Sequence, residues 1–538
     1  MSALSFDATG AARAAVEAHA AALADDAVAS RIFAKDHTLW GTEAEEESAK
    51  RLGWVEAATV SQPLVADILT LRDELRGEGI DRIVLCGMGG SSLAPEVITA
   101  TAGVPLVVLD STDPEQVRAA LDERLEATAI VVSSKSGSTA ETDSQRRAFE
   151  AAFTAAGIDA TRRIIIVTDP GSPLDAASRE AGYRAVFNAD PTVGGRYSAL
   201  TAFGLVPSGL AGVDIQALLD EAEEAAELLR EDSADNIGLQ LGAALGGTSP
   251  LRDKIVIVED GSGIAGFADW AEQLIAESTG KIGRGVLPVV ASVDSPEVSS
   301  GADDVLVVRL VSADADPQVG AHEVAVGGGL AAQMLLWEFA TAVAGRLLGI
   351  NPFDQPDVEA AKVAARGLLD ARPEPTPAVF TEGSVEVRGG EWLDGAATVT
   401  EAVRAVLGEL GEDGYVSVQA YLDRLAFGEL EQVRDALAAA TGRPATFGWG
   451  PRFLHSTGQY HKGGPAVGVF LQITADADED VDIPGRPFTF GELIAAQAAG
   501  DAQVLAEHGR PVLRLHLTDR RAGVEKVLET AASLRAQA

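Results

Sequence analysis

A stretch dense in hydroxyl groups follows residues 130–132, whose apolar composition is typical of a strand buried on both faces. A helix is predicted directly after it, over residues 140–152. The side chains between them are Ser133, Ser134, Lys135, Ser136, Ser138 and Thr139. Hydroxyls, a glycine backbone and a helix N-terminus offer many hydrogen-bond donors and the positive end of a dipole, which suits a phosphate monoester. A serine-rich turn that only caps the helix is an equally good interpretation.

A second turn with similar properties occupies residues 86–95, after another predicted strand. It contains Gly87, Gly89, Gly90, Ser91 and Ser92. The glycines allow a tight turn and a close approach of the backbone to a ligand, although a dinucleotide site would use the same pattern. Because the carboxyl ends of parallel strands converge on one crevice, the two turns together predict a binding site better than either does alone.

Candidate groups for proton transfer lie further along the chain. Arg196 stands between glycines and a serine in residues 193–198, where it is either a ligand-facing or an ordinary surface arginine. In the predicted helix 269–280, Gln273 and Glu277 are four residues apart and share a face. Glu277 would sit at the negative end of the helix dipole, where its charge is disfavoured, so it is a candidate general base. An exposed glutamate at a helix end is the alternative.

Two later stretches also carry chemical groups. A buried apolar helix is predicted over 331–348, and it leads into an Asn-Pro turn and a short helix that ends at Lys362. Residues 453–465 form a glycine-rich loop with His455 and His461, whose spacing fits no standard helical metal site. Structural hydrogen bonding is the alternative for both histidines.

The elements that must position these residues alternate between short apolar runs and helices from residue 81 onward. This alternation predicts an α/β protein with two doubly wound parallel-sheet domains and a further C-terminal α/β domain. Strands are expected at 83–85, 106–109, 130–132, 164–167, 255–258, 286–290, 305–308, 415–418, 466–473 and 512–517. The predicted parts are an N-terminal helical segment (1–60), two sheet domains (61–210 and 211–370), a Pro-rich linker (371–377) and the C-terminal domain (378–538).

Composition limits the partners. The 42 Lys plus Arg residues face 81 Asp plus Glu, and the net charge of −39 would repel nucleic acid and anionic lipid. No signal peptide or membrane span is evident, so we expect a cytoplasmic protein. The single Cys86 excludes an intramolecular disulfide and a cysteine-cluster metal site. The expected partner is a small phosphorylated molecule, held without a metal or cofactor.

Taken together, these motifs resemble those of the phosphoglucose isomerase family, in the same order along the chain. The match covers roughly residues 30–365, and the remainder is similar to the end of the transaldolase/phosphoglucose isomerase fusion proteins. The five matching segments are Gly87–Ser91, Ser134–Thr142, Gly194–Ser198, Glu277–Lys281 and Asn351–Lys362.

The resemblance implies a role for each candidate residue. Arg196 would stabilise an enediolate, Glu277 would be the base and Lys362 would face the ring oxygen of a sugar. The other implied substrate-binding residues are Gly89, Gly90 and Gln273. The 6-phosphate would be held by Ser91, Ser134, Lys135, Ser136, Ser138 and Thr139.

Two departures from the family pattern matter. Thr279 replaces an asparagine, and the Asn-Gly-Gln-His motif with the ring-opening histidine is absent. In the family this histidine comes from a second subunit. We predict that His461 replaces it in cis, because the C-terminal domain could fold over the cleft. The protein would then be a monomer with a complete site, or otherwise a homodimer. The alternatives to His461 are His455, His322 or no histidine at all.

The expected activity is the interconversion of glucose 6-phosphate and fructose 6-phosphate, a step of glycolysis and gluconeogenesis. One alternative is an enzyme that also isomerises mannose 6-phosphate, and another is a non-catalytic sugar-phosphate sensor. A sensor needs the phosphate loop but not Arg196, Glu277 and Lys362, so the presence of all three favours an enzyme.

Overall fold

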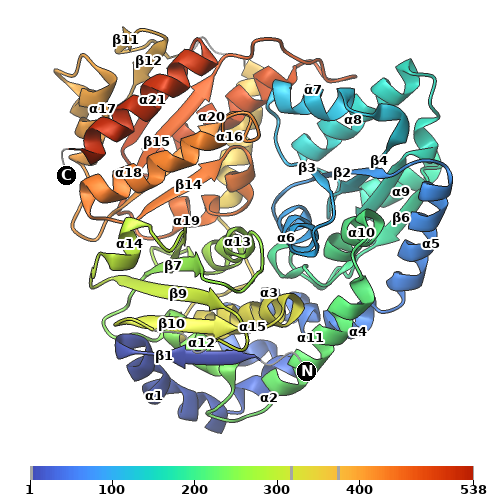
Figure 1. Ribbon diagram of the computed structural model, residues 1–538, viewed down its shortest axis with the longest axis vertical. Coiled ribbons are helices and arrows are strands. Elements are labelled where there is room, and N and C mark those ends of the chain that lie inside the picture. Colours follow the sequence, from blue (N-terminus) through green and yellow to red (C-terminus); the bar gives the residue numbers. More distant parts are fainter. Residues whose placement is uncertain (1–3, 316–318, 372–375, 537–538) are drawn as a thin grey trace.

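Three β-sheets, each flanked by helices, organise the protein (Figure 1). The structure is a computed structural model that describes residues 4–315, 319–371 and 376–536. We refer to each sheet with its helices as the first, second and third unit, in chain order. The α/β class and the parallel sheets predicted from the sequence are confirmed. None of the helices in the described ranges combines the length and apolar composition of a membrane span.

The first unit is a fully parallel sheet with the strand order β3-β2-β4-β5-β6. Its central strands β2 and β4 are buried along their whole length, and all of their residues except Arg82, Thr128 and Ser133 are apolar or glycine. The strands are β2 (Arg82–Gly87), β3 (Val107–Leu109), β4 (Thr128–Ser133), β5 (Ile164–Thr168) and β6 (Ala185–Asn188). The helices are α5 (Leu64–Gly77), α6 (Leu93–Ala102), α7 (Pro114–Asp122), α8 (Ala140–Ala155), α9 (Pro173–Ala181) and α10 (Ala202–Ala211).

The second unit has the strand order β1-β10-β9-β7-β8, parallel except for β1. The strands are β1 (Ser5–Ala8), β7 (Lys254–Glu259), β8 (Leu287–Ala291), β9 (Val305–Val311) and β10 (Glu323–Gly327). The larger helices are α1 (Gly10–Asp25), α11 (Ile215–Leu229), α12 (Ile237–Gly246), α13 (Phe267–Thr279) and α15 (Leu330–Leu348). The shorter helices are α2 (Val28–Phe33), α3 (Glu45–Arg51), α4 (Ala57–Ser61) and α14 (Pro296–Ser299).

The N-terminal segment differs from the prediction that residues 1–60 are helical only. Residues 5–8 form the antiparallel edge strand β1, paired with β10, and α1 packs against α12. The segment is therefore part of the second unit. A four-residue strand is too short for its alternation to be visible in the sequence.

The third unit has the strand order β11-β12-β16-β15-β13-β14, with β13 to β16 parallel. The strands are β11 (Phe380–Glu382), β12 (Val385–Arg388), β13 (Tyr415–Tyr421), β14 (Ala445–Trp449), β15 (Gly468–Ala475) and β16 (Val512–Leu517). The helices are α17 (Val399–Leu407), α18 (Gln432–Thr441), α19 (Gly458–Gly463), α20 (Phe490–Glu507) and α21 (Arg520–Arg535). Helix α16 (Val358–Ala371) precedes this unit and packs against α20. Of the predicted linker, residues 372–375 lie outside the described residues.

The third unit is held against the other two by an apolar cluster and by ion pairs. Tyr415, Tyr460 and Phe470 pack with Val256 and Ala276 of the second unit. Arg434 pairs with Glu297 at 2.9 Å, and Arg520 pairs with Asp113 of the first unit at 2.9 Å. All four of these charged side chains are almost fully buried. Removing one partner of such a pair typically costs about 3 to 5 kcal/mol because the other charge is left buried and unpaired, so the pairs fix how the third unit docks on the other two.

Candidate active site

Two loops at the carboxyl ends of strands in the first unit form one wall of the site. After β2 the chain makes a 3₁₀ turn, η3 (Gly89–Ser91), and after β6 another, η6 (Gly195–Tyr197). A Cβ atom on Gly90 would lie 2.0 Å from the Gly195 carbonyl oxygen. Only glycine at position 90 allows the two loops to touch, and this contact positions Arg196.

The Arg196 guanidinium is buried, with only 3% of the side chain exposed, and is fixed by neighbours from the second unit. Its Nε donates to the Ser278 hydroxyl at 2.8 Å and its Nη2 to the Pro352 carbonyl at 2.7 Å. Its Nη1 lies 3.7 Å from Glu277 Oε1. A buried cation is thus held beside the predicted base, where it can stabilise a developing oxyanion.

Gln273 and Glu277 lie on one face of α13, as the four-residue spacing predicted. Gln273 Nε2 donates to Glu277 Oε2 at 3.2 Å and to the His455 carbonyl at 2.7 Å. Gln273 Oε1 is buried without a partner among the described residues. Because a buried amide oxygen without a partner is costly, it is well suited to accept a hydrogen bond from a substrate hydroxyl.

Lys281 holds the next part of the site together, a role that the sequence did not suggest. Its Nζ donates to the carbonyls of Asn351 at 2.7 Å and Asp354 at 2.6 Å, and to Asp354 Oδ1 at 2.7 Å. Burial, with the nearby charge of Arg196, lowers the pKa of Lys281 to about 8. The lysine fixes the 351–354 turn, whose carbonyls in turn accept from Arg196.

The hydroxyl-rich loop between β4 and α8 lies at the rim of the first sheet. Ser134 Oγ is 3.2 Å from Thr139 Oγ1, and Ser136 Oγ is 2.6 Å from Ser138 Oγ. Thr139 is the N-cap residue of α8, but its hydroxyl makes no cap hydrogen bond. The first turn of α8 therefore keeps its N–H groups available for an anion.

Two other predicted phosphate ligands, Ser91 and Lys135, differ in whether their polar groups already have partners. The Ser91 hydroxyl in η3 makes no hydrogen bond within the described part of the chain. Lys135 Nζ instead donates to the Val193 carbonyl at 2.5 Å and lies 3.3 Å from Asp169. Burial lowers the pKa of Lys135. Its ammonium is already engaged, which argues against the predicted role of Lys135 as a phosphate ligand; it anchors the loop that leads to Arg196.

His455 is the histidine that the structure brings to these residues. It lies in the 3₁₀ turn η9 (Arg452–His455), and its main chain lies close to Gly89, since a Cβ there would be 2.7 Å from the His455 carbonyl oxygen. Its Nε2 is 2.9 Å from Glu141 Oε1. Gln497 of α20 donates to the same carboxylate oxygen at 2.7 Å.

The Glu141 carboxylate is kept charged by its neighbours. Burial alone would raise its pKa, but the His455 imidazole, with a smaller contribution from Lys362, holds that pKa below its usual range. Lys362, on α16, is thus near the Glu141–His455 pair. No specific signal in the sequence marked Glu141, although it lies within the hydroxyl-rich motif.

His461 does not join the site. It lies inside the third unit, where its ring packs against Tyr415 and Phe470 and its nitrogens face Gln419 at 3.4 Å and Ser417 at 3.5 Å. Burial, with the charges of Lys462 and Arg510, lowers its pKa well below the ordinary value. A histidine kept neutral in an apolar interior is poorly placed for proton exchange with a substrate. The prediction that favoured His461 is therefore not supported.

His322 is also remote from these groups. It directly precedes β10, and its Nδ1 accepts a hydrogen bond from the Ala11 N–H at 2.9 Å. It therefore caps the start of α1, which is a structural role.

Fold and site together define an α/β protein in which two doubly wound sheets and a third unit surround a carboxylate, an arginine and a hydroxyl-rich loop. Residues 73–253 match the family model described as phosphoglucose isomerase. The chain is 30% identical over 371 residues to a probable glucose-6-phosphate isomerase of Natronomonas pharaonis, covering 60% of this chain and 86% of that protein. It is also 30% identical to a glucose-6-phosphate isomerase of Rubrobacter xylanophilus, covering 55% of this chain and 84% of that protein.

Solved structures have the same fold. A hypothetical protein of Thermus thermophilus superimposes with a TM-score of 0.57 at 25% identity, covering 68% of this chain and all (100%) of that one. A glucose-6-phosphate isomerase of Chlamydia trachomatis gives a TM-score of 0.50 at 20% identity, covering 60% of this chain and 79% of that one. The chain belongs to the phosphoglucose isomerase family. The similarity of its end to the transaldolase fusion proteins stays a prediction.

Proposed function

We propose that the protein interconverts glucose 6-phosphate and fructose 6-phosphate through an enediolate. The observation that carries this proposal is the position of Glu277, with Gln273 Nε2 at 3.2 Å and Arg196 Nη1 at 3.7 Å. Removing a proton next to a carbonyl needs a carboxylate base and a cation for the oxyanion that forms. The names of the similar enzymes support the same reaction.

In the proposed reaction Glu277 takes the proton from C2 of the open-chain aldose and returns it to C1. Arg196 stabilises the negative charge on the enediolate oxygen, and the free Oε1 of Gln273 accepts from a sugar hydroxyl. The phosphate binds at the start of α8, with Ser134, Thr139 and the other loop hydroxyls as donors. The N–H groups of the first helical turn add donors that a dianion favours.

Ring opening is the step that we assign to His455 in place of His461. The carboxylate of Glu141 orients its imidazole, and Lys362 lies near the pair. Histidine exchanges protons near neutral pH, which suits proton transfer to the ring oxygen. His455 belongs to the third unit of the same chain, so the proposed site needs no residue from a second copy.

The test of the reaction is Glu277→Gln, which removes the base and keeps the shape of the side chain. Isomerisation in a coupled assay should fall by about 10²- to 10⁴-fold, the contribution of a positioned base. Exchange of the C2 proton with solvent should fall in parallel, while inorganic phosphate should still compete for binding. Near-normal turnover in this variant would remove Glu277 from the mechanism. The same assay with mannose 6-phosphate tests the wider specificity.

A further inference from the structure

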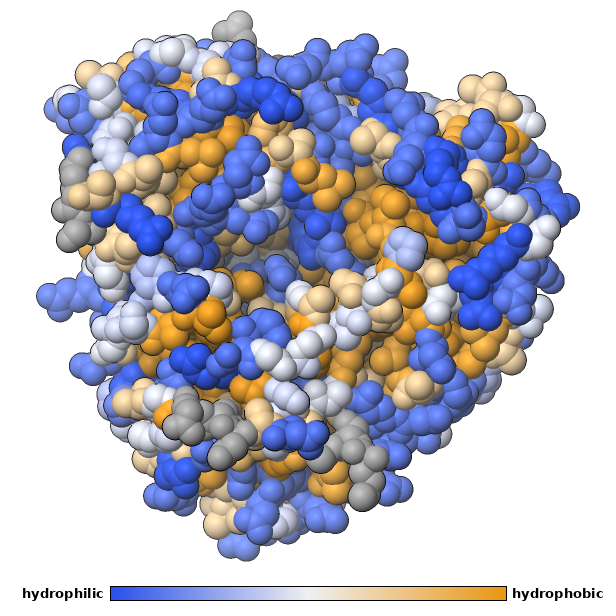
Figure 2. All heavy atoms as spheres, viewed as in Figure 1, coloured by the Kyte–Doolittle hydropathy of each residue, from blue (hydrophilic) through white to orange (hydrophobic). Residues whose placement is uncertain are grey.

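A cavity of about 410 Å³ lies where the three units meet, and it contains none of the predicted site residues. Figure 2 shows a hollow near the middle of the face in view, at the place where β14, α13 and α6 come together in Figure 1. The cavity borders the active site, because its wall includes Glu272 beside Gln273 and Ser456 beside His455. Its volume is within the range of small-molecule sites.

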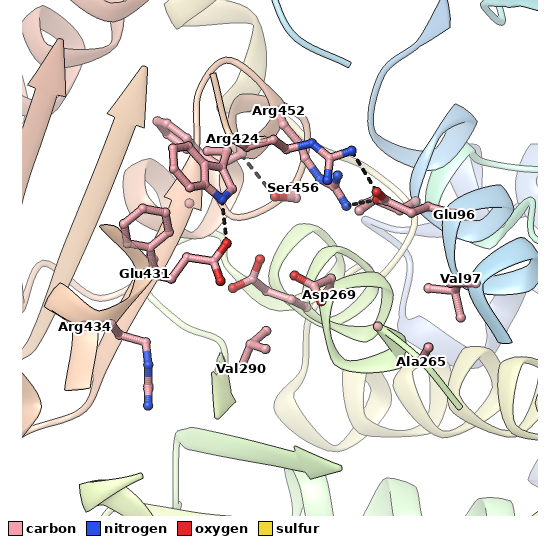
Figure 3. Close-up of a pocket in the computed structure, with 18 residues that line it drawn as sticks. Glu96, Val97, Ala265, Asp269, Val290, Arg424, Glu431, Arg434, Arg452 and Ser456 are labelled. Atoms are coloured by element: carbon pink, nitrogen blue, oxygen red, sulfur yellow. Dashed lines mark hydrogen bonds and ion pairs between the residues drawn. The ribbon is translucent and has the colours of Figure 1, made fainter. Parts of the chain in front are cut away.

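The arginines in the cavity wall already have carboxylate partners. Arg424 and Arg452 both bind Glu96, at 2.7 and 2.6 Å (Figure 3). Arg434 is paired with Glu297 at 2.9 Å, as described above. These arginines are thus in close ion pairs with Glu96 and Glu297, and Arg452 attracts Asp269 and Glu272 only at longer range.

Two carboxyl groups of α13 in the same wall, those of Asp269 and Glu272, have no close polar partner among the residues that the structure describes. Neither Asp269 nor Glu272 makes an ion pair or a side-chain hydrogen bond within the described ranges. Figure 3 shows Asp269 and Glu431 on facing sides of the cavity. The wall thus contains four carboxyl groups, of Glu96, Asp269, Glu272 and Glu431, against three arginines.

Glu272 is the least exposed of the acidic residues in this wall. Only 8% of the residue is exposed, and its carboxyl group has no partner among the described residues. Burial, together with repulsion from Asp269, raises its pKa well above the ordinary value. Asp269 is exposed to solvent at the cavity, although desolvation by the surrounding protein still raises the pKa of its carboxyl group. A buried acid without a partner is costly, and a cation in the cavity would remove that cost.

An aromatic wall stands near these acids. The rings of Phe447 and Trp449 are 4.9 Å apart in an edge-to-face arrangement, and Trp449 Nε1 donates to Glu431 Oε1 at 2.7 Å. Aromatic faces attract ammonium groups and bind the carbon chain that carries them. In the part of the chain that the structure describes, no group of His, Cys, Asp and Glu side chains could hold a metal ion. The lining thus favours an organic cation.

We propose that this cavity binds a small organic ammonium ion, such as a diamine of a few carbons, between the carboxyl groups of Asp269 and Glu272 and the Phe447–Trp449 wall. The site is separate from the sugar-phosphate site and does not depend on the proposed reaction. Glu272 adjoins Gln273 in α13, so an occupied cavity would contact the helix that carries the catalytic base.

The test is a calorimetric titration of the full chain with putrescine at about 0.15 M salt, which screens distant charges. The neutral diol 1,4-butanediol, of similar length, is the ligand control. We expect putrescine to bind at least tenfold more tightly than the diol. Glu272→Gln should lower its affinity at least tenfold, and Glu431→Gln should lower it less.

The matched control is Glu227→Gln, which removes the same charge from an exposed position on the acidic helix α11. It measures how much of the binding is general attraction to a chain with a net charge of −39. Equal binding of putrescine and the diol would overturn the proposal. So would a Glu272→Gln variant that is folded by circular dichroism and binds putrescine as tightly as Glu227→Gln does.

Discussion

Two short segments each carry polar side chains that the sequence offered as candidates for one site, and in both segments these side chains point in different directions. In residues 453–465, His455 reaches Glu141 and the site, whereas His461 is packed inside the third unit. In residues 134–139, Thr139 lies at the start of α8, whereas Lys135 turns to Asp169 and Val193.

The difference shows that proximity in sequence does not decide which surroundings a side chain enters. The chain forms η9, turns at Ser456, and continues as α19, so His455 and His461 face different surroundings. In each segment one polar group serves the proposed chemistry and the other holds the scaffold. Single substitutions of each member of a pair distinguish the two roles.

The strongest test of the comparison is His455→Ala. Turnover of the cyclic sugar phosphate should fall by about 10²- to 10⁴-fold, because a positioned acid–base group is lost from ring opening. Proton exchange at C2 of an open-chain analogue should stay near the parent value. Anomer interconversion at the parent rate would show that His455 does not open the ring.

The phosphate loop gives the next largest effect. Thr139→Ala should raise the KM for fructose 6-phosphate about ten- to a hundredfold, since a hydrogen bond to a charged group is worth roughly 1.5 to 3 kcal/mol. Lys135→Met is the paired variant. It should lower the free energy of unfolding, and it should raise the KM less than Thr139→Ala does. If Lys135→Met has the larger effect on KM and inorganic phosphate competition, the ammonium binds phosphate after all.

A smaller effect is expected from Glu141→Gln, which keeps the shape but removes the charge beside His455. Turnover should fall about tenfold through the loss of a charged hydrogen bond. The pKa of Glu141 is lower in the folded state than the ordinary glutamate value. The ionised carboxylate therefore stabilises the fold at a pH above the ordinary value, and this stabilisation is lost as the pH falls through the folded-state pKa. The variant should therefore lose less stability on acidification. An unchanged pH dependence of urea unfolding would contradict the assignment.

His461→Ala should have the smallest effect on catalysis. Removing a buried ring should destabilise the protein by roughly 2 to 4 kcal/mol through the cavity left behind. The turnover of the folded fraction should stay near that of the parent, as urea unfolding and steady-state kinetics on one preparation can show. A selective loss of ring opening without a loss of stability would restore His461 to the mechanism.

The sequence by itself determined the α/β class, most strands of both doubly wound sheets and the pairing of Gln273 with Glu277. These follow from local rules: a strand buried on both faces must be an apolar run, and residues four apart share a helix face. The strands that it missed are β1, β6, β10, β11, β12 and β14, and none of these has more than five residues. Such segments carry too little periodicity to be distinguished from loops.

Only the tertiary structure decided which histidine reaches the site, where Lys135 points and what Lys281 supports. Each of these depends on a contact between residues far apart in the chain, such as His455 with Glu141 or Lys281 with Asp354. The same holds for Glu272: within its helix it is one more glutamate. Its unpaired state arises because the third unit closes over α13 and brings arginines that already have other partners. Local sequence sets the backbone, but the partners of a buried charge are set by packing.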